Sequence, residues 1–266
     1  MSEKMSNAPV YYALAQARFN PVGAMAKYVE EVQDRLRRVG YTLFEPQQVT
    51  HLQIATAASQ APVEPQVAHT LSWLITKGDR TAGFILGASS ITFHTTHYET
   101  RNEFIAELLR GLKAVHAVAE LDHVNRLGLR YLDAVVPQAN DRVADYLVGG
   151  LHGVEFGAIP RYAMNESVFA TTSGPLLSSG TLVARVHWMN APLGFPPDMV
   201  PNGLVLMPRF ASNQVRDHAV IDIDHFVEGT MALDFSAIQQ QLVSLQATIR
   251  QAFEATITEH ARRVWA

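Results

Sequence analysis

The sequence predicts an α+β fold in which antiparallel meander sheets carry helices packed on one face and a long helix closes the chain. Three observations lead to this prediction. Short apolar runs are separated by turn residues, amphipathic repeats of helical period follow the strand groups, and the last residues keep one long helical stripe. The 266 residues are 48% hydrophobic, which is sufficient for a sizeable core.

The chain opens with a strand and a helix. Residues 10–19 are rich in strand-forming side chains. Asn20 and Pro21 then suit the cap and first turn of a helix, whose apolar stripe ends at Gly40. Prolines and small residues at 56–66 predict a surface loop.

A meander of three strands is expected next, because turn residues separate apolar runs at 69–78, 80–89 and 90–98. Thr100 then begins a helix as its N-cap, with Glu103 reaching back in a capping-box pattern. The buried face of this helix is expected to carry Phe104, Ile105, Leu108, Leu109, Leu112 and Val115.

The segment 127–137 returns as a strand that Pro137 ends, and the short polar stretch 138–142 is the best internal boundary. We therefore predict two halves, 1–137 and 138–266, within one compact two-lobed unit. For the second half we expect a short helix at 141–151 and strands at 162–171, 181–189, 204–207 and 220–227.

The last predicted element is a long helix from Asp234 to Arg263. Its apolar stripe contains Phe235, Ile238, Leu242, Leu245, Ile249, Phe253 and Ile257. The opposite, solvated face is expected to carry Gln239, Gln240, Gln241 and Gln246. Such a helix outruns a single small sheet, so we expect it to cross both halves or to form a homo-oligomer. The two halves share an outline of strand, polar end, turn and helix, which leaves an internal duplication open.

Composition and charge exclude several functions. The net charge is −4 and no broad basic surface is present, so nucleic-acid binding is disfavoured. The absence of cysteine excludes disulfides, thiolate zinc sites, iron–sulfur clusters and cysteine nucleophiles. No window approaches the roughly 20 apolar residues of a membrane helix, and the first residues lack the apolar core of a signal peptide. We expect a cytoplasmic protein without membrane contact.

The segment 93–100, FHTTHYET, places two histidines, a tyrosine and a glutamate at the end of a predicted strand. Alternation on a strand directs His94 and His97 to opposite faces, so a metal site would require a kink and a third ligand. Two interpretations stay open. The segment is a polar strand end that caps the next helix, or it contributes to a pocket in which a histidine donates hydrogen bonds.

The segment 126–133, RLGLRYLD, is the second candidate. Alternation places Tyr131 and Asp133 on one strand face and Arg130 on the other. A guanidinium suits bidentate recognition, so Arg130 is expected either in a structural ion pair or in a site for a ligand anion. The candidate residues for binding a protein partner or a small ligand are His94, His97, Tyr98, Arg130 and Tyr131.

Residues 216–226, RDHAVIDIDHF, hold the densest group of metal-competent side chains. On a strand, Asp222 and Asp224 share a face about 7 Å apart at ~3.3 Å rise per residue, which suits one hard cation. His225 is the candidate third ligand. A solvent-facing strand fits the same pattern. The sequence also lacks G-x-S-x-G, G-x-x-x-x-G-K and H-E-x-x-H, and no motif identifies a cofactor.

Several segments resemble a family of sporadically distributed bacterial and archaeal proteins of similar length, for which no function is established. The matching segments are YALAQARFNPV (12–22), RLRRVGY (35–41), GFILGASSITFHTTHYET (83–100), RLGLRYLDAVVP (126–137) and IRQAFEATIT (249–258). The most specific motifs are FHTT-x-Y and RLGLRY-x-D. The resemblance implies one α+β unit and brings no catalytic residues. The family's patchy distribution resembles that of genes in defence-associated neighbourhoods, which implies a partner-dependent role.

We therefore favour a non-catalytic binding protein that recognises a protein partner or a small ligand. The first alternative is a metal-dependent enzyme of hydrolase type, in which Asp222, Asp224 and a histidine hold a cation that activates water. The second alternative is a structural subunit of a larger complex.

Overall fold

A computed structural model describes residues 7–53, 66–154, 156–157, 161–172, 174–199 and 201–266. In this part, nine strands form one antiparallel sheet with the order β2-β3-β4-β5-β1-β6-β9-β8-β7. The strands are β1 (Val10–Phe19), β2 (Leu43–Gln53), β3 (Gln66–Thr76), β4 (Ala82–Gly87), β5 (Ser90–Thr95), β6 (His123–Val135), β7 (Tyr162–Thr172), β8 (Ser179–Ala191) and β9 (Arg216–Ala232). The helices are α1 (Met25–Arg37), α2 (Arg101–Ala119), α3 (Val143–Tyr146), α4 (Phe235–Thr256) and α5 (Glu259–Trp265), with a 3-10 turn at Gly149–Leu151. The predicted combination of antiparallel strands and helices, including a C-terminal helix, is confirmed.

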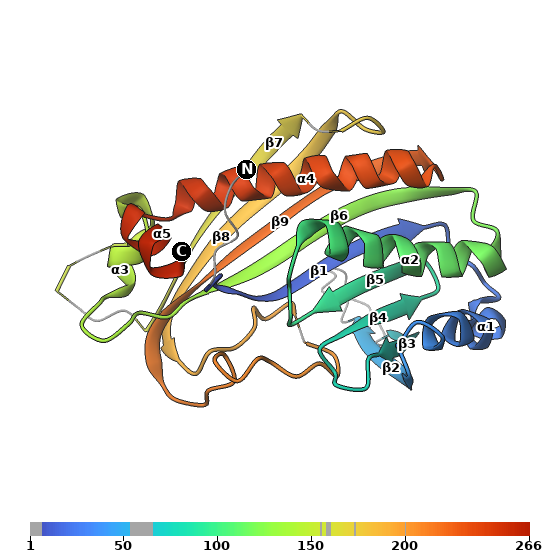
Figure 1. The fold of residues 1–266 in the computed structure, drawn as a ribbon, viewed down its shortest axis with the longest axis horizontal. Coiled ribbons are helices and arrows are strands. Elements are labelled where there is room, and N and C mark those ends of the chain that lie inside the picture. The colour runs from blue at the N-terminus through green and yellow to red at the C-terminus, as the bar shows by residue number, and fades with distance from the viewer. Residues whose placement is uncertain (1–6, 54–65, 155, 158–160, 173, 200) are drawn as a thin grey trace, which may run out of the picture.

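One continuous sheet contains strands from both predicted halves (Figure 1). The two central strands, β1 and β6, pair with each other, and Leu14 lies opposite Arg130. The sheet continues from β6 to β9, so it runs across the boundary predicted at 137/138. The predicted meander is confirmed as β3, β4 and β5, which pair in sequence order.

The main core lies between the sheet and the helices α1, α2 and α4. Figure 1 shows α2 and α4 running across the sheet, and both helices contribute to the largest buried cluster together with alternate residues of β1 and β6. All six residues predicted for the buried face of α2 are buried. The predicted cap is confirmed as well, because the Thr100 hydroxyl accepts from the Glu103 amide at 3.2 Å and donates to the Glu103 carboxylate at 2.8 Å.

A second apolar cluster covers the other face of the sheet. The connection between β8 and β9 places Leu193, Met199, Leu204 and Phe210 against strand residues that include Tyr12 and Leu132. The strand predicted at 204–207 is therefore wrong. Its amides bond locally or to another loop, since Leu204 donates to Pro201 O at 3.0 Å and Val205 donates to Arg80 O at 2.9 Å. Burial of Leu204 in this cluster explains the apolar pattern without a strand.

The predicted single C-terminal helix is wrong, because it is broken at Ile257. That residue has an extended backbone and forms a bridge with Leu147, so α4 ends at Thr256. Thr258 caps α5 by accepting from the Ala261 amide at 3.2 Å. Its hydroxyl also donates to Asp145 O at 2.6 Å, which ties the break to α3.

Two further expectations differ at their boundaries, and a third falls almost entirely outside the described residues. The first helix begins at Met25 instead of Asn20, because Val22 is held in a turn by donating to Ala88 O at 2.8 Å. The short helix expected at 141–151 divides into α3 and the 3-10 turn. The loop expected at 56–66 lies outside the described residues, except for Gln66, which begins β3.

Gln241 is completely buried, which corrects the expectation that it lies on a solvated face. Its Oε1 accepts from the amides of Leu176 at 3.0 Å and Leu177 at 3.2 Å, so α4 satisfies the polar backbone of the turn before β8. Gln239 and Gln240 are exposed as expected, and Gln246 is half-buried.

Replacing Gln241 with leucine is expected to lower the free energy of unfolding by about 2–3 kcal/mol. The change leaves two partly buried amides without their buried acceptor, and an unsatisfied buried donor costs about 1–3 kcal/mol. Urea denaturation measures the loss, and Gln240→Leu at the adjacent exposed position provides the matched control. Equal stability of the two variants would contradict the role assigned to Gln241.

Candidate functional site

The five predicted binding residues do not converge on one site. His94 and Arg130 lie on the sheet face that the β8–β9 connection covers, whereas Tyr131 belongs to the core on the helix face. His97 and Tyr98 follow β5 and approach the beginning of α2. Alternation along β6 separates Arg130 from Tyr131, as the sequence predicts.

His94 is completely buried, and its Nδ1 lies 3.0 Å from the hydroxyl of Tyr12. Burial lowers the pKa of His94 to about 3, so the ring is neutral at physiological pH. Tyr12 was absent from the predicted set, because only the pairing of β1 with β5 brings it beside His94.

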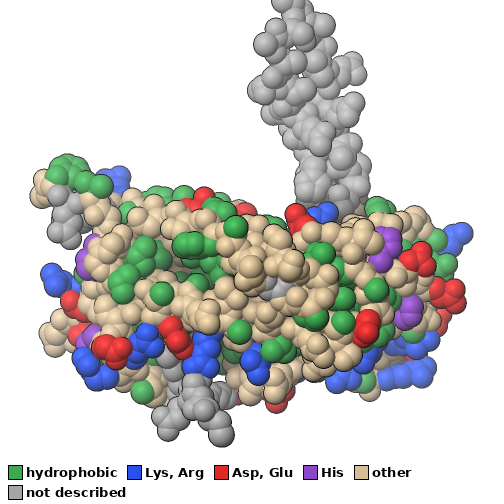
Figure 2. Space-filling model, turned by 90° about the horizontal axis from the view of Figure 1, so that it is seen from above, with side chains coloured by type: hydrophobic (Ala, Val, Ile, Leu, Met, Phe, Trp, Pro, Cys, Tyr) green, Lys and Arg blue, Asp and Glu red, His purple; other side chains and the backbone are tan. Residues whose placement is uncertain are grey.

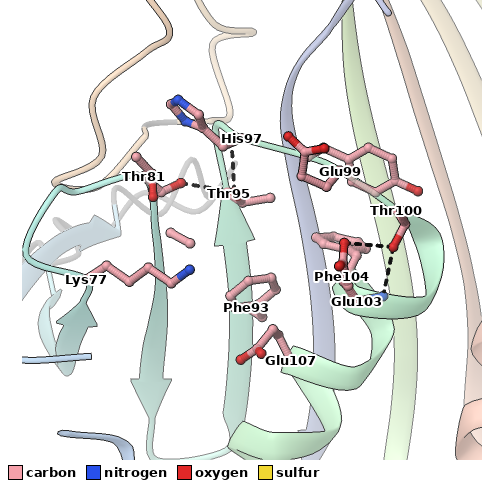
Figure 3. Close-up of a pocket in the computed structure, with 12 residues that line it drawn as sticks. Lys77, Thr81, Phe93, Thr95, His97, Glu99, Thr100, Glu103, Phe104 and Glu107 are labelled. Carbon is pink, nitrogen blue, oxygen red and sulfur yellow. Dashed lines mark hydrogen bonds between the residues drawn. The ribbon is translucent and has the colours of Figure 1, made fainter. Parts of the chain in front are cut away.

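A pocket of about 390 Å³ opens between the beginning of α2 and strands β4 and β5 (Figure 3). Much of its lining comes from the segment 93–100 that the sequence singled out. The contributing residues are Phe93, Thr95, His97, Tyr98, Glu99 and Thr100. Of the predicted binding residues, His97 and Tyr98 therefore share this pocket.

The base of the pocket is aromatic. The ring centroids of Phe93 and Phe104 are 5.6 Å apart, and those of Tyr98 and Phe104 are 5.4 Å apart. The ring of Tyr98 also contacts that of Tyr131 edge-on, with 5.3 Å between the centroids. Tyr131, another predicted binding residue, therefore packs against a residue that lines the pocket. Burial raises the pKa of Tyr98, which keeps its phenol protonated as a hydrogen-bond donor.

Opposite charges occupy opposite walls of the pocket. Figure 3 shows Lys77 and His97 on the strand side, and Glu99, Glu103 and Glu107 on the side where α2 begins. Three carboxylates therefore face one ammonium group. The position of Glu107 is fixed, since it accepts from the Tyr41 hydroxyl at 2.8 Å and pairs with Arg110 at 3.1 Å.

Lys77 is the basic group of the pocket. Its Nζ lies 5.8 Å from the ring centroid of Tyr41. Within the described part of the chain, Lys77 forms no salt bridge within 4.0 Å. Its ammonium is therefore available to an acceptor that enters the pocket.

Arg130 is the centre of a buried ion-pair network on the other sheet face. Its Nε and Nη2 donate to the two carboxylate oxygens of Asp222, both at 2.7 Å. Nη1 and Nη2 donate to Asp198 at 2.6 and 3.1 Å. Burial disfavours the charged form of Arg130, but the hydrogen bonds that Arg130 donates to the carboxylates of Asp222 and Asp198 outweigh this effect and raise its pKa. Of the two roles expected for Arg130, the structure displays the ion pair with protein carboxylates.

The proposed metal ligands do not face one another. Asp222 is engaged by Arg130, and Asp224 lies 3.8 Å from Arg126. His225 points to the opposite face, where its Nδ1 is 3.0 Å from Leu245 O and its Nε2 is 2.8 Å from the Thr171 hydroxyl. Within the described ranges, no three His, Asp or Glu side chains form a group that could hold a metal ion. The geometry gives the hydrolase alternative no support.

Several residues of these sites were missed. Lys77, Thr81 and Asp198 carry no local signal, because each reaches its site through a turn or a long connection. A sequence signal does exist for Glu103 and Glu107. They lie four residues apart on the helix that the segment 93–100 caps, so they share a helix face.

Together the fold and the pocket define an α+β protein built on one antiparallel sheet, with a small charged cavity where α2 begins. Comparison of the sequence with family models and with curated proteins gives no match. Among the described residues, no helix is both long and apolar enough to span a membrane.

Proposed function

We propose that the chain is a non-catalytic binding protein that holds a small ligand in the pocket between β5 and α2. One observation carries this proposal: the segment 93–100 contributes half of a cavity that combines an aromatic base with charged walls. The volume of about 390 Å³ falls within the usual 300–1,000 Å³ of ligand sites. Hydrogen-bonding groups placed around an apolar base are what such sites use to orient a ligand.

The charges of the pocket favour a particular ligand class. The excess of carboxylates on the α2 side favours a positively charged group, and Lys77 across the pocket favours an acceptor such as a carboxylate. Phe93 and Phe104 between the two walls favour an apolar body. The ligand class that meets all three conditions is a small zwitterion with an apolar side chain, such as an apolar amino acid.

Free phenylalanine and phenethylamine are suitable probes, since they share an aromatic body and an ammonium group but differ in the carboxylate. By isothermal titration calorimetry, we expect Glu103→Gln to weaken both probes at least about tenfold, because a hydrogen bond to a charged group contributes about 1.5–3 kcal/mol. Lys77→Met should weaken phenylalanine alone. Glu30→Gln on the exposed face of α1 is the charge-matched control. Failure of the wild type to bind either probe would contradict the ligand class.

We also propose that the two halves arose by duplication and that all their helices share one sheet face. The strand order supports this, because β3-β4-β5-β1 on one side of the centre is matched by β7-β8-β9-β6 on the other. Each half then runs strand, helix, strands and helix, with α2 and α4 in equivalent places. α1, α2 and α4 contribute to one buried cluster, which supports the shared face.

Membership of the sporadically distributed family stays a proposal, together with the partner-dependent role that its distribution suggests. The motif FHTT-x-Y begins in β5 and continues past its end, and the motif RLGLRY-x-D lies in β6. Both strands pair with β1. The motifs therefore flank one central strand of the sheet. This placement supports the use of the two motifs together to recognise proteins of this fold.

A further inference from the structure

We propose that two copies of this chain pair through the edge strand β7 and form one continuous antiparallel sheet. This inference is independent of the pocket. In Figure 1, β7 is the last strand of the sheet on the side of α4, and all of its eleven residues pair with β8. Within the described part, no strand covers its other edge.

The surface around β7 is unusually apolar. The side chains of Val168 and Tyr162 are 63% and 55% exposed, and those of Phe169 and Met164 are 50% and 49% exposed. Figure 2 looks down on the side where β7 and α4 lie in Figure 1, and it shows hydrophobic side chains at the surface. An exposed apolar strand edge is a template for pairing with another strand.

The two edges of the sheet differ in protection. At the far edge, β2 carries Pro46, which has no amide hydrogen to offer, and Glu45, which pairs with Arg80. The sequence of β7, YAMNESVFATT, contains no proline, lysine or arginine and only one charged residue, Glu166. Edge strands that do not pair with another chain normally carry proline or charged residues, especially lysine. The composition of β7 therefore indicates an edge that pairs.

The strand order shows what is missing at this edge. β7 occupies the place in its half that β3 occupies in the other half, and β3 is covered by β2. The chain between α3 and β7 supplies no described strand in the position of β2. A second copy of β7 would fill that position in both subunits at once.

The sequence of β7 is complementary to itself in an antiparallel pairing. When two copies of β7 pair, directly opposed residues point to the same sheet face. The two-fold axis that relates the copies therefore passes beside a single residue, which lies opposite its own copy, and any residue of β7 satisfies this condition. With the axis at Ser167, Glu166 lies opposite Val168 of the partner subunit. With the axis at Val168, it lies opposite Ala170 of the partner subunit. Either register keeps the only charged residue away from its own copy, which favours a second copy over an unrelated strand as the occupant.

Sedimentation velocity of the full chain tests the proposal. We expect a dimer for the wild type, and we expect Ser167→Lys/Phe169→Lys to raise its dissociation constant at least about tenfold, because like charges then face each other in both registers. Both positions are exposed, so the fold should persist, and an unchanged circular dichroism spectrum verifies this. Gln239→Lys/Gln240→Lys adds the same charge to the exposed face of α4 as the control.

A cross-link locates the axis. The chain has no cysteine, so Ser167→Cys or Val168→Cys introduces a single thiol. Directly opposed residues lie about 4.5–5.5 Å apart between Cα atoms, within disulfide reach. We expect one of the two to give a covalent dimer under mild oxidation, while Ser236→Cys on α4 stays monomeric. A monomeric wild type, or a dimer that only the α4 lysines dissociate, would overturn the proposal.

Discussion

Replacement of Arg130 with methionine is expected to lower the free energy of unfolding by about 3–5 kcal/mol, the cost of breaking a buried ion pair by removing one partner. Asp222 is completely buried, and two of its hydrogen bonds come from Arg130 at 2.7 Å. The nearest remaining cationic group is Arg185, whose Nη1 is 3.6 Å away. A methionine side chain fills a similar volume but leaves the carboxylate without its donors.

Urea denaturation at neutral pH measures this loss, and Asp198→Asn is the matched control. Asp198 also pairs with Arg130, but its side chain is 62% exposed, so its loss should cost about 1 kcal/mol or less. The double variant Arg130→Met/Asp222→Leu removes both buried charges and should recover a large part of the stability. Equal costs for Arg130→Met and Asp198→Asn would refute the central role of the buried pair.

Strand alternation predicts the sheet face on which Arg130 lies, but it does not identify the carboxylates that pair with it. The pattern in 126–133 placed Arg130 opposite in direction to Tyr131, and the structure agrees. The sequence predicts that Asp222 lies on a strand face and is a candidate metal ligand. The pairing of β6 with β9, which brings two strands distant in sequence together, makes it the partner of Arg130 instead. Periodicity determines faces, whereas strand order depends on the whole sheet.

Two elements show where local signals fail. β2 was missed because Pro46 and its glutamines do not form the apolar alternation of a buried strand, and an edge strand tolerates both. The helix stripe in the last residues continued through Ile257, yet a tertiary bridge to Leu147 breaks the helix there. Periodicity could not reveal this break, because the spacing of Ile257 fits the apolar stripe of a helix and the bridge to Leu147 depends on a residue distant in sequence.

The pocket was predicted in part. The segment 93–100 was recognised for its density of polar side chains, and it lines the cavity. Alternation predicts that His94 and His97 point to opposite strand faces, and the sequence leaves open which of them enters the pocket. The structure places His97 in the pocket, whereas His94 is directed through the sheet to Tyr12. Charged residues such as Lys77 enter the pocket only because β3 and β4 pair beside β5.

The second large effect concerns Asp133, whose replacement with asparagine should stabilise the protein above neutral pH. Asp133 is buried in β6, and burial raises its pKa to about 7. Its ordinary value in an unfolded chain is about 3.9. Between these values the folded state retains a proton that the unfolded state has lost, so stability declines as pH rises from about 4 to 7. The full penalty amounts to at most about 4 kcal/mol.

Asparagine cannot ionise, so the difference in unfolding free energy between Asp133→Asn and the wild type isolates this effect. We expect the difference to be small near pH 4, to grow toward pH 7 and then to stay constant, as measured by urea denaturation at each pH. Asp122→Asn, at an exposed position, is the surface control. A difference that grows in the opposite direction would show that Asp133 is ionised in the folded state.

The comparison between Asp133→Asn and the wild type is needed because another buried group, His94, changes the unfolding free energy with pH in the opposite direction. The pKa of His94 is lowered to about 3, so the unfolded chain binds an extra proton below its ordinary value of about 6.5. The contribution of neutral His94 to stability is therefore lost as pH falls from about 6.5 toward 3, whereas that of protonated Asp133 is lost as pH rises. Between pH 4 and 6.5 the two slopes offset each other in the wild type. His94→Gln should remove one of them and expose the declining slope of Asp133, which Asp133→Asn should then abolish.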